Sequence, residues 1–247
     1  MSALRTLTAV EAKLFLRDPS APVTVLGIPI ALVVVFALIP AASEPSAEFG
    51  GNSVLANLIA PLAVSILVAM LALTIFPTIL STYREKGVLR RIAASPVPPR
   101  TVLIAQLVVN VASAFVVVLL VVVAGTLVIG MEAPGNPAGL ALSVALGTAA
   151  LFSMGLLVAA LAPTGRAAGA IGSAAFFPML ALGGVWVPKE RLPEFLQHAA
   201  DVLPMGAMYN AMRETWAGAA PQAMQLVAMA VFTVVCLALS ARFFRWQ

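Results

Sequence analysis

The stretch VLANLIAPLAVSILVAMLALTIFPTIL, residues 54–80, decides the fold class because it contains no charged side chain. A bilayer core of roughly 30 Å is crossed by about 20 apolar residues in a helix, since each residue adds about 1.5 Å. Backbone groups in lipid need internal partners, and the stretch lacks the period-two alternation of a barrel strand. It therefore predicts a transmembrane helix.

Similar apolar runs lie on both sides of this stretch and extend the prediction to the whole chain. The sequence is 62% hydrophobic and 10% charged, whereas soluble domains carry about 25% charged residues. The first run is longer than the core of a signal peptide, so we expect it to be a membrane span. The fold class predicted is an all-α integral membrane protein with one transmembrane domain over residues 1–247. Its six predicted spans are residues 21–42, 54–80, 101–130, 138–162, 167–187 and 222–241.

The distribution of Lys and Arg between the loops predicts the orientation. Cytoplasmic loops carry the excess of cations, and here the cations divide eleven to three. Both termini are therefore expected in the cytoplasm. Trp186 and Trp216 then fall near the outer interface, and Tyr83 and Trp246 near the inner one, as in an aromatic belt. The larger set is Arg5, Lys13, Arg17, Arg84, Lys86, Arg90, Arg91, Arg100, Arg166, Arg242 and Arg245, and the smaller set is Lys189, Arg191 and Arg213.

The N-terminal residues 1–20 form an amphipathic pattern and predict a helix on the cytoplasmic membrane surface. Leu7, Val10 and Leu14 lie on its apolar side, which Glu11 interrupts. A carboxylate at that position needs a cation or a protein partner. Alternatively, Glu11 extends to the surface as an ordinary solvated side chain.

The outer segment, residues 188–220, is too long for a turn and too polar to cross the membrane. Its prolines divide it into pieces of about ten residues, a length typical of re-entrant or interfacial segments. One helical stripe in it has two interpretations: a face that packs on the bundle, or a flexible lid that admits apolar cargo. The stripe consists of Met205, Met208, Tyr209, Met212 and Trp216.

Several function classes are disfavoured by what the sequence lacks. No ionisable side chain lies in the middle of a predicted span, which argues against transport driven by protons or sodium ions. No HExxH or paired aspartate indicates an intramembrane protease, and no basic and aromatic pattern indicates nucleic-acid binding. The single Cys236 cannot form a disulfide within the chain.

ATP hydrolysis is not expected in this chain. A phosphate-binding loop ends in Gly-Lys-Ser/Thr, but the three lysines follow Ala12, Glu85 and Pro188. We therefore expect no enzyme activity and no cofactor in this chain, with ATP and Mg²⁺ bound by a separate partner.

The cytoplasmic loop at residues 83–100 is the predicted attachment point for that partner. Val88, Leu89 and Ile92 give a short apolar face beside Arg90 and Arg91. The proline cluster that follows ends the helix before the third span. A soluble motor subunit could grip such an exposed helix, although the same cations could merely contact anionic lipid head groups.

These features resemble the permease subunit of the type-2 ABC transporter family, which includes bacterial daunorubicin-resistance exporters. Four short motifs carry the resemblance in the same order and spacing over nearly the whole chain. They are Glu11 with Arg17-Asp18-Pro19; Glu85-Lys86-Gly87 through Arg90-Arg91 to Ser95-Pro96-Val97; Gly183-Gly184-Val185-Trp186-Val187-Pro188 continuing to Leu192-Pro193; and Leu203-Pro204 with Ala211-Met212-Arg213.

The resemblance implies a subunit of the bacterial inner membrane that works with two ATP-binding subunits and a second permease copy or paralogue. It implies that the N-terminal helix and the loop at 83–100 contact the ATPases, and that the outer segment is a re-entrant cap. The implied coupling residues are Glu85, Lys86, Gly87, Arg90 and Arg91, with Glu11 as a possible ion-pair partner of one of the arginines.

The transport pathway is a weaker prediction. Gln106, Asn110 and Ser113 form one face of the third span, and Asn57 and Ser65 form a stripe on the second. Such side chains either touch cargo or hydrogen-bond between helices. Gly165, Gly169 and Ser173 predict close helix packing at the start of the fifth span.

Together these predictions favour an exporter permease for an amphipathic drug, a lipid or a glycolipid. The alternatives are a membrane anchor or assembly factor for a soluble partner, and a passive channel or ion-coupled carrier.

Overall fold

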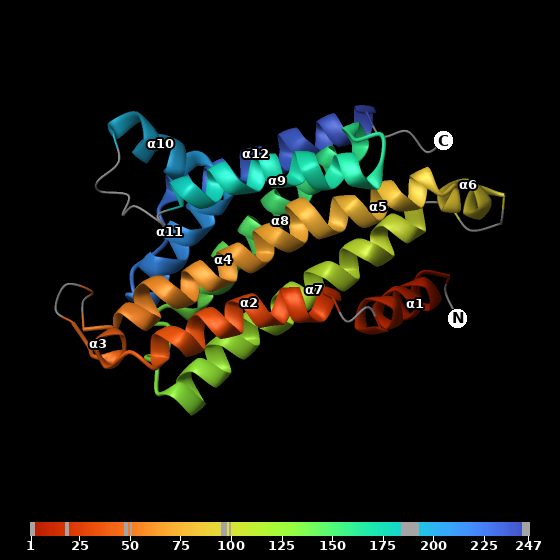
Figure 1. Ribbon diagram of the computed structural model, residues 1–247. Helices are drawn as coiled ribbons and strands as arrows, with labels where there is room; N and C mark the ends of the chain where they lie inside the picture. Colours follow the sequence, from red (N-terminus) through yellow and green to blue (C-terminus); the bar gives the residue numbers. More distant parts are fainter. Residues whose placement is uncertain are drawn as a thin grey trace.

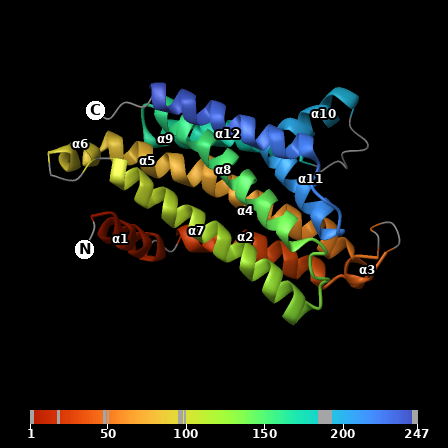
Figure 2. The same ribbon diagram turned by 180° about the vertical axis from the view of Figure 1, so that it is seen from behind.

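The computed structural model describes residues 3–17, 20–46, 49, 51–94, 98, 100–183 and 193–243. Within these ranges the chain is helical, and its one β-bridge joins Pro45 and Ser53. The long helices run side by side in an elongated bundle (Figures 1 and 2). Helices α1 and α6 lie at one end of it, and α3 and α10 lie at the other.

The helices follow the predicted order. They are α1 (Ala3–Arg17), α2 (Ser20–Ala37), α3 (Pro40–Ser43), the π-helical turn η2 (Leu55–Ile59), α4 (Ala60–Met70), η3 (Leu71–Ile75), α5 (Phe76–Glu85), α6 (Val88–Ala93), α7 (Arg100–Ala124), η4 (Gly125–Ile129), α8 (Pro137–Leu161), α9 (Gly165–Leu182), α10 (Glu194–Val202), α11 (Pro204–Trp216) and α12 (Ala223–Phe243).

Five helices in the described residues are long and apolar enough to cross a membrane, which confirms the all-α membrane class. Helix α2 coincides with most of the first predicted span but is not among these five helices. A sixth crossing and the orientation in the membrane therefore remain predictions. The five helices are Leu55–Glu85, Thr101–Ile129, Pro137–Leu161, Gly165–Leu182 and Ala223–Phe243.

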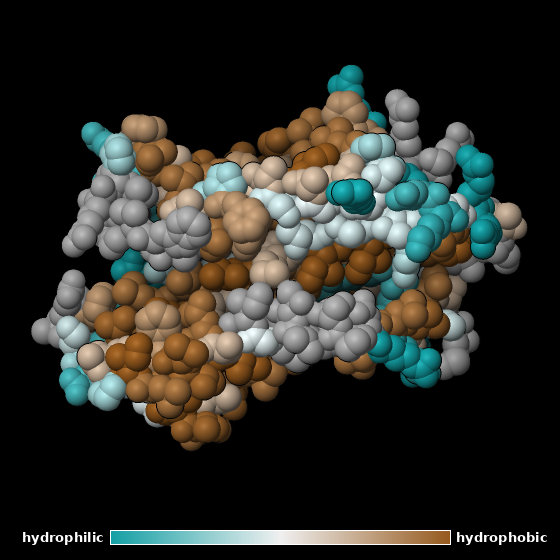
Figure 3. Space-filling view, in the orientation of Figure 1, coloured by the Kyte–Doolittle hydropathy of each residue, from teal (hydrophilic) through white to brown (hydrophobic). Residues whose placement is uncertain are grey.

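The continuous helix Leu55–Glu85 forms the centre of the bundle. Its side chains Val64, Leu73 and Phe76 have no exposed surface. The helices at the periphery of the bundle instead expose large apolar side chains, among them Leu119 on α7 at 63% and Val234 on α12 at 67%. Burial of apolar area contributes about 25 cal/mol per Å², so this surface requires lipid or protein around it. Hydrophobic side chains cover much of the face in Figure 3.

The central helix contains two π-helical turns, each followed by a proline. The pattern Leu-Ala-x-x-Ile-x-Pro occurs at residues 55–61 and again at 71–77. At the second copy the Phe76 N–H donates to the Leu71 carbonyl, five residues back. Pro77 has no N–H, so it cannot give the Leu73 carbonyl its usual partner. These turns therefore widen the helix and leave carbonyl groups near its centre without their usual N–H partners.

Glycines of the neighbouring helices pack against those carbonyls. A side chain at Gly155 of α8 would overlap the Ala72 carbonyl oxygen, and one at Gly172 of α9 would overlap that of Leu73. At the start of α9, Gly165 and Gly169 lie against Thr82 and Thr78, which confirms the predicted close packing there. Helices α8 and α9 thus pack directly against the backbone of the central helix.

Candidate functional site

Helix α6 extends from the end of the bundle and presents the basic residues predicted to contact a partner. Gly87 separates it from α5 with φ of +67°, a conformation that glycine adopts at little cost. Leu89 is buried and anchors the short helix, whereas Arg90 and Arg91 are exposed. The predicted amphipathic character of this helix is confirmed.

The end of α5 is tied to the connection between α8 and α9. The Glu85 Oε2 atom accepts a hydrogen bond of 3.0 Å from the Gly165 N–H at the start of α9. Arg84 donates from Nη2 to the Ala162 carbonyl. A carboxylate is favourable at a helix N-terminus because it complements the free N–H groups and the helix dipole. Glu85 thus has an internal structural contact, while Lys86 next to it is exposed.

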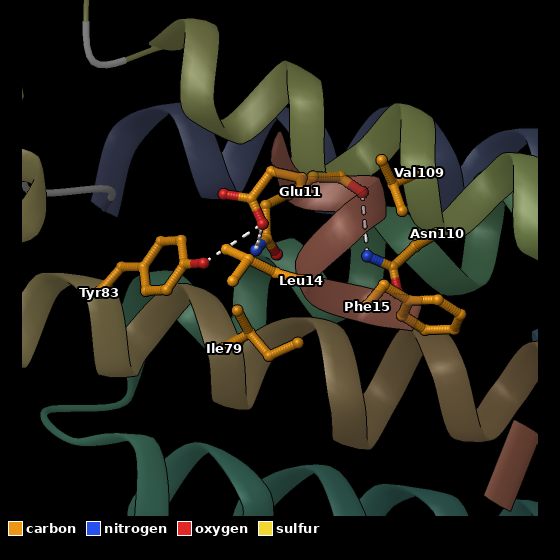
Figure 4. Close-up of a pocket in the computed structure, with 8 residues that line it drawn as sticks. Glu11, Leu14, Phe15, Ile79, Tyr83, Val109 and Asn110 are labelled. Carbon is orange, nitrogen blue, oxygen red and sulfur yellow. Dashed lines mark hydrogen bonds between the residues drawn. The ribbon is translucent and has the colours of Figure 1, made fainter. Parts of the chain in front are cut away.

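Glu11 lies in a polar cluster between α1, α5 and α7. Its side chain is 8% exposed, and its Oε2 atom accepts hydrogen bonds from Gln106 Nε2 at 2.9 Å and Tyr83 Oη at 3.2 Å. Figure 4 shows Glu11 and Tyr83 pointing toward one another. Burial raises the pKa of the Glu11 carboxyl above its ordinary value of 4.5, and the two hydrogen bonds offset part of that shift.

The ion pair predicted between Glu11 and Arg90 or Arg91 is therefore wrong. Helix α1 packs along α7, which turns Glu11 inward, and both arginines are exposed on α6. The sequence predicts only packing or cargo contact for Gln106 and only a place in an aromatic belt for Tyr83. Helical period places a side chain on a face, but it does not identify the neighbouring helix.

Gln106 and Asn110 extend the same cluster one turn along α7. Each is 3% exposed, and Asn110 Nδ2 donates to the Gln106 carbonyl at 2.9 Å. Ser113 donates to its own helix at Val109, and Ser65 on α4 does the same at Pro61. The serine contacts favour packing within the helices.

The cavity in this cluster has a volume of about 260 Å³ and is lined by Gln106 and Asn110 but not by Asn57 or Ser65. Asn57 is nevertheless buried. Of the two predicted pathway stripes, only the one on α7 lines this cavity. Within the described part of the chain, no three His, Cys, Asp or Glu side chains gather closely enough to hold a metal ion.

The outer stripe on α11 is an internal packing face. Helix α11 packs against α8, α12 and α4, and Met208 lies against Gly147 of α8. Its buried members are Met205, Met208, Tyr209, Met212 and Trp216. These contacts support the packing interpretation over a lid that touches cargo.

Trp216 is enclosed rather than placed at a lipid interface, so its assignment to an aromatic belt is wrong. Its Nε1 donates at 3.0 Å to the Glu132 carbonyl, and the Glu132 carboxylate accepts from Ser53 Oγ at 2.6 Å. A buried indole N–H needs such a partner. Trp216 therefore joins α11 to the loop after η4.

Several predicted features lie outside the described residues. These are Asp18-Pro19 of the first motif, Ser95-Pro96-Val97 of the second, residues 184–192 of the third, and the belt residues Trp186 and Trp246.

Comparison with known proteins supports one family. The family model described as ABC-2 type transporter matches residues 2–217, which include α1, α6, α10 and α11. A search of curated proteins found no match. Because the family model covers most of the helical bundle, the chain belongs to the ABC-2 type transporter family and is a membrane component of transport.

Proposed function

We propose that this chain is the permease subunit of an exporter driven by ATP that a separate chain hydrolyses. The observation that carries the proposal is α6, a short helix with exposed Arg90 and Arg91 that is anchored by Leu89 and joined to α5 through one glycine. An exposed, anchored helix with this charge suits contact with a soluble motor subunit better than lipid contact alone.

The connection from α6 to the bundle gives a route for movement. A pull on α6 acts on α5, whose end is bonded to α9 through Glu85 and to the preceding connection through Arg84. Gly165 and Gly172 keep α9 in close contact with α5 and η3. Helices α5 and α9 are therefore expected to move together when the motor closes on ATP, and this movement opens the pathway alternately to each side.

The proposed assembly contains two ATP-binding subunits and two permeases, either identical or paralogous, in a bacterial inner membrane. The apolar bundle and its few buried amides suit an amphipathic drug, a lipid or a glycolipid as cargo. Lys86, Arg90 and Arg91 are the residues proposed to touch the ATPase, with Gly87 as the flexible joint.

Charge reversal at Arg90 tests the proposal directly. Arg90→Glu should lower cargo-stimulated ATP hydrolysis and transport by roughly tenfold, which corresponds to about 1.4 kcal/mol, with membrane insertion intact. The matched control is Arg242→Glu, since Arg242 is also exposed but ends α12. Unchanged transport in the Arg90 variant would refute the coupling role.

The alternative is an anchor that uses α6 to hold a soluble partner without moving cargo. The same exposed arginines suit that role. Cargo added to the reconstituted complex separates the two functions, because only a permease should make ATP hydrolysis depend on cargo.

A further inference from the structure

The polar cluster around Glu11 has more hydrogen-bond acceptors than donors. Gln106 uses Nε2 for the Glu11 carboxylate, and Asn110 uses Nδ2 for the Gln106 carbonyl. The oxygens Gln106 Oε1 and Asn110 Oδ1 are buried and accept no hydrogen bond. Burial of an acceptor without a donor is unfavourable, so the cluster is incomplete as it stands.

The missing group must donate hydrogen bonds and is best positively charged. Glu11 supplies the charge, and the two amides supply neutral acceptors around the same cavity of about 260 Å³. A primary ammonium carries three N–H donors and no acceptor, which matches three acceptor side chains. Both amide oxygens are shielded from the cavity in this structure. An ammonium bound to the Glu11 carboxylate replaces the Gln106 donor there, so the amides can turn about their terminal torsions, which are broadly populated, and bring their oxygens to the ammonium.

An apolar groove continues from this cavity along α1 and α7. It has a volume of about 350 Å³ and shares Phe15 and Val109 with the cavity. Leu16 in its wall is 73% exposed and Val116 is 55% exposed. The groove volume lies at the lower end of the roughly 300–1,000 Å³ typical of ligand sites, and the cavity volume lies just below that range. A ligand that fills both spaces needs a donor head and an apolar tail.

The exposed side of α1 adds cations near this site. Arg5, Lys13 and Arg17 are exposed on the helix whose inner side carries Glu11. Cations on an interfacial helix attract phosphate groups at the membrane surface. The site thus offers an acidic interior to an ammonium and basic side chains to a phosphate.

We propose that the cavity and groove between α1 and α7 bind a bilayer phospholipid whose head group carries a primary ammonium. The ammonium occupies the cavity beside Glu11, Gln106 and Asn110, and an acyl chain lies in the groove along Phe15 and Val116. A choline head group has no N–H donor and leaves the amide oxygens unpaired. An anionic head group without an amine faces the Glu11 carboxylate and is repelled. The bound lipid holds α1 against α7, and its binding does not require that the chain transports cargo.

Photo-crosslinking tests this proposal without the ATPase. The full chain is reconstituted in phosphatidylcholine nanodiscs that contain traces of phosphatidylethanolamine with a photoreactive acyl chain. The same tail is then compared on the mono-, di- and trimethylated head groups. We expect several-fold more labelling of residues 3–17 and 100–117 with the primary amine, and a stepwise decrease as each methyl group removes a donor.

Variants test whether Glu11 recognises the ammonium head group. Glu11→Gln should reduce labelling by the primary amine to the level of the trimethylated lipid. The control Glu44→Gln, at an exposed carboxylate on the far end of the bundle, should change nothing. Equal labelling of the wild-type chain by all four head groups would overturn the proposal even if the Glu11 variant fails to fold. Stronger labelling by phosphatidylglycerol, or cross-linking of this face only to a second copy of the chain, would also overturn it.

Discussion

The Glu11 carboxyl shows how burial changes a side chain that would be ordinary on a surface helix. It is enclosed by α1, α5 and α7 and held by two hydrogen bonds from neutral donors. No cation is among those partners, so the charged form is disfavoured and the pKa is raised. The residue therefore links the position of α1 to protonation.

The raised pKa of Glu11 predicts a pH-dependent stability in phosphatidylcholine. The folded protein binds a proton more tightly than the unfolded chain, in which the Glu11 carboxyl has its ordinary pKa. Stability therefore decreases as pH rises from the unfolded pKa through the folded one, and is constant above that window. Thermal unfolding across pH should show this decrease in the wild-type chain but not in Glu11→Gln. Parallel curves for the two proteins would contradict it.

The Gly87 joint predicts a backbone effect at one residue. Gly87→Ala places a side chain at positive φ, where about 1–2 kcal/mol of strain is expected, although nothing lies within 4 Å of the added carbon. The expected result is an intact bundle with weaker binding of the ATP-binding subunit, and Gly87→Asn should retain more binding because asparagine tolerates this conformation. Equal binding by all three proteins would show that binding does not depend on the positive φ at residue 87.

At the scale of elements, the π-helical turn η3 determines how closely three helices approach. Pro77 leaves carbonyls of the turn without ordinary helical partners, and glycines of α8 and α9 fill the space beside them. Lipid tails are as apolar as the helix surfaces, so the hydrophobic effect does not favour contact between helices over contact with lipid. Helix packing in a membrane therefore depends on small residues that allow close approach.

This packing predicts a position-specific cost for alanine on α9. Gly172→Ala must displace the Leu73 carbonyl, and overpacking of this kind costs about 1–3 kcal/mol. Gly169→Ala is the matched control, since its added carbon would lie 3.2 Å from the Thr78 Oγ1 atom, a side chain that can adjust. Resistance to unfolding in detergent should fall clearly for the first variant and little for the second. A larger loss of stability for Gly169→Ala than for Gly172→Ala would show that η3 does not determine how closely α9 approaches the central helix.

The same elements show what the sequence could predict. Uncharged runs and their lengths identify the membrane class because lipid excludes charge, and the amphipathic α6 follows from local spacing. The π turns are not among the features predicted from the sequence, although the pattern Leu-Ala-x-x-Ile-x-Pro occurs at both of them. The partners of Glu11 and the burial of Trp216 were also missed, because they depend on which helices meet.

At the scale of the whole molecule, the basic helix α6 lies at one end of the bundle, and α3 and α10 lie at the other (Figure 1). The central helix Leu55–Glu85 runs between them and carries both π turns. A force applied at α6 therefore enters the most buried helix of the bundle directly. This arrangement suits a machine whose energy is supplied from outside the chain.

We propose that a complex of this chain with a separate ATPase transports cargo at the expense of ATP. The decisive measurement is cargo flux in proteoliposomes that contain this chain, the ATP-binding subunit, or both. We predict flux that requires both proteins and ATP hydrolysis and that Arg90→Glu lowers by roughly tenfold. Flux through this chain alone, driven by an ion gradient, would contradict the claim.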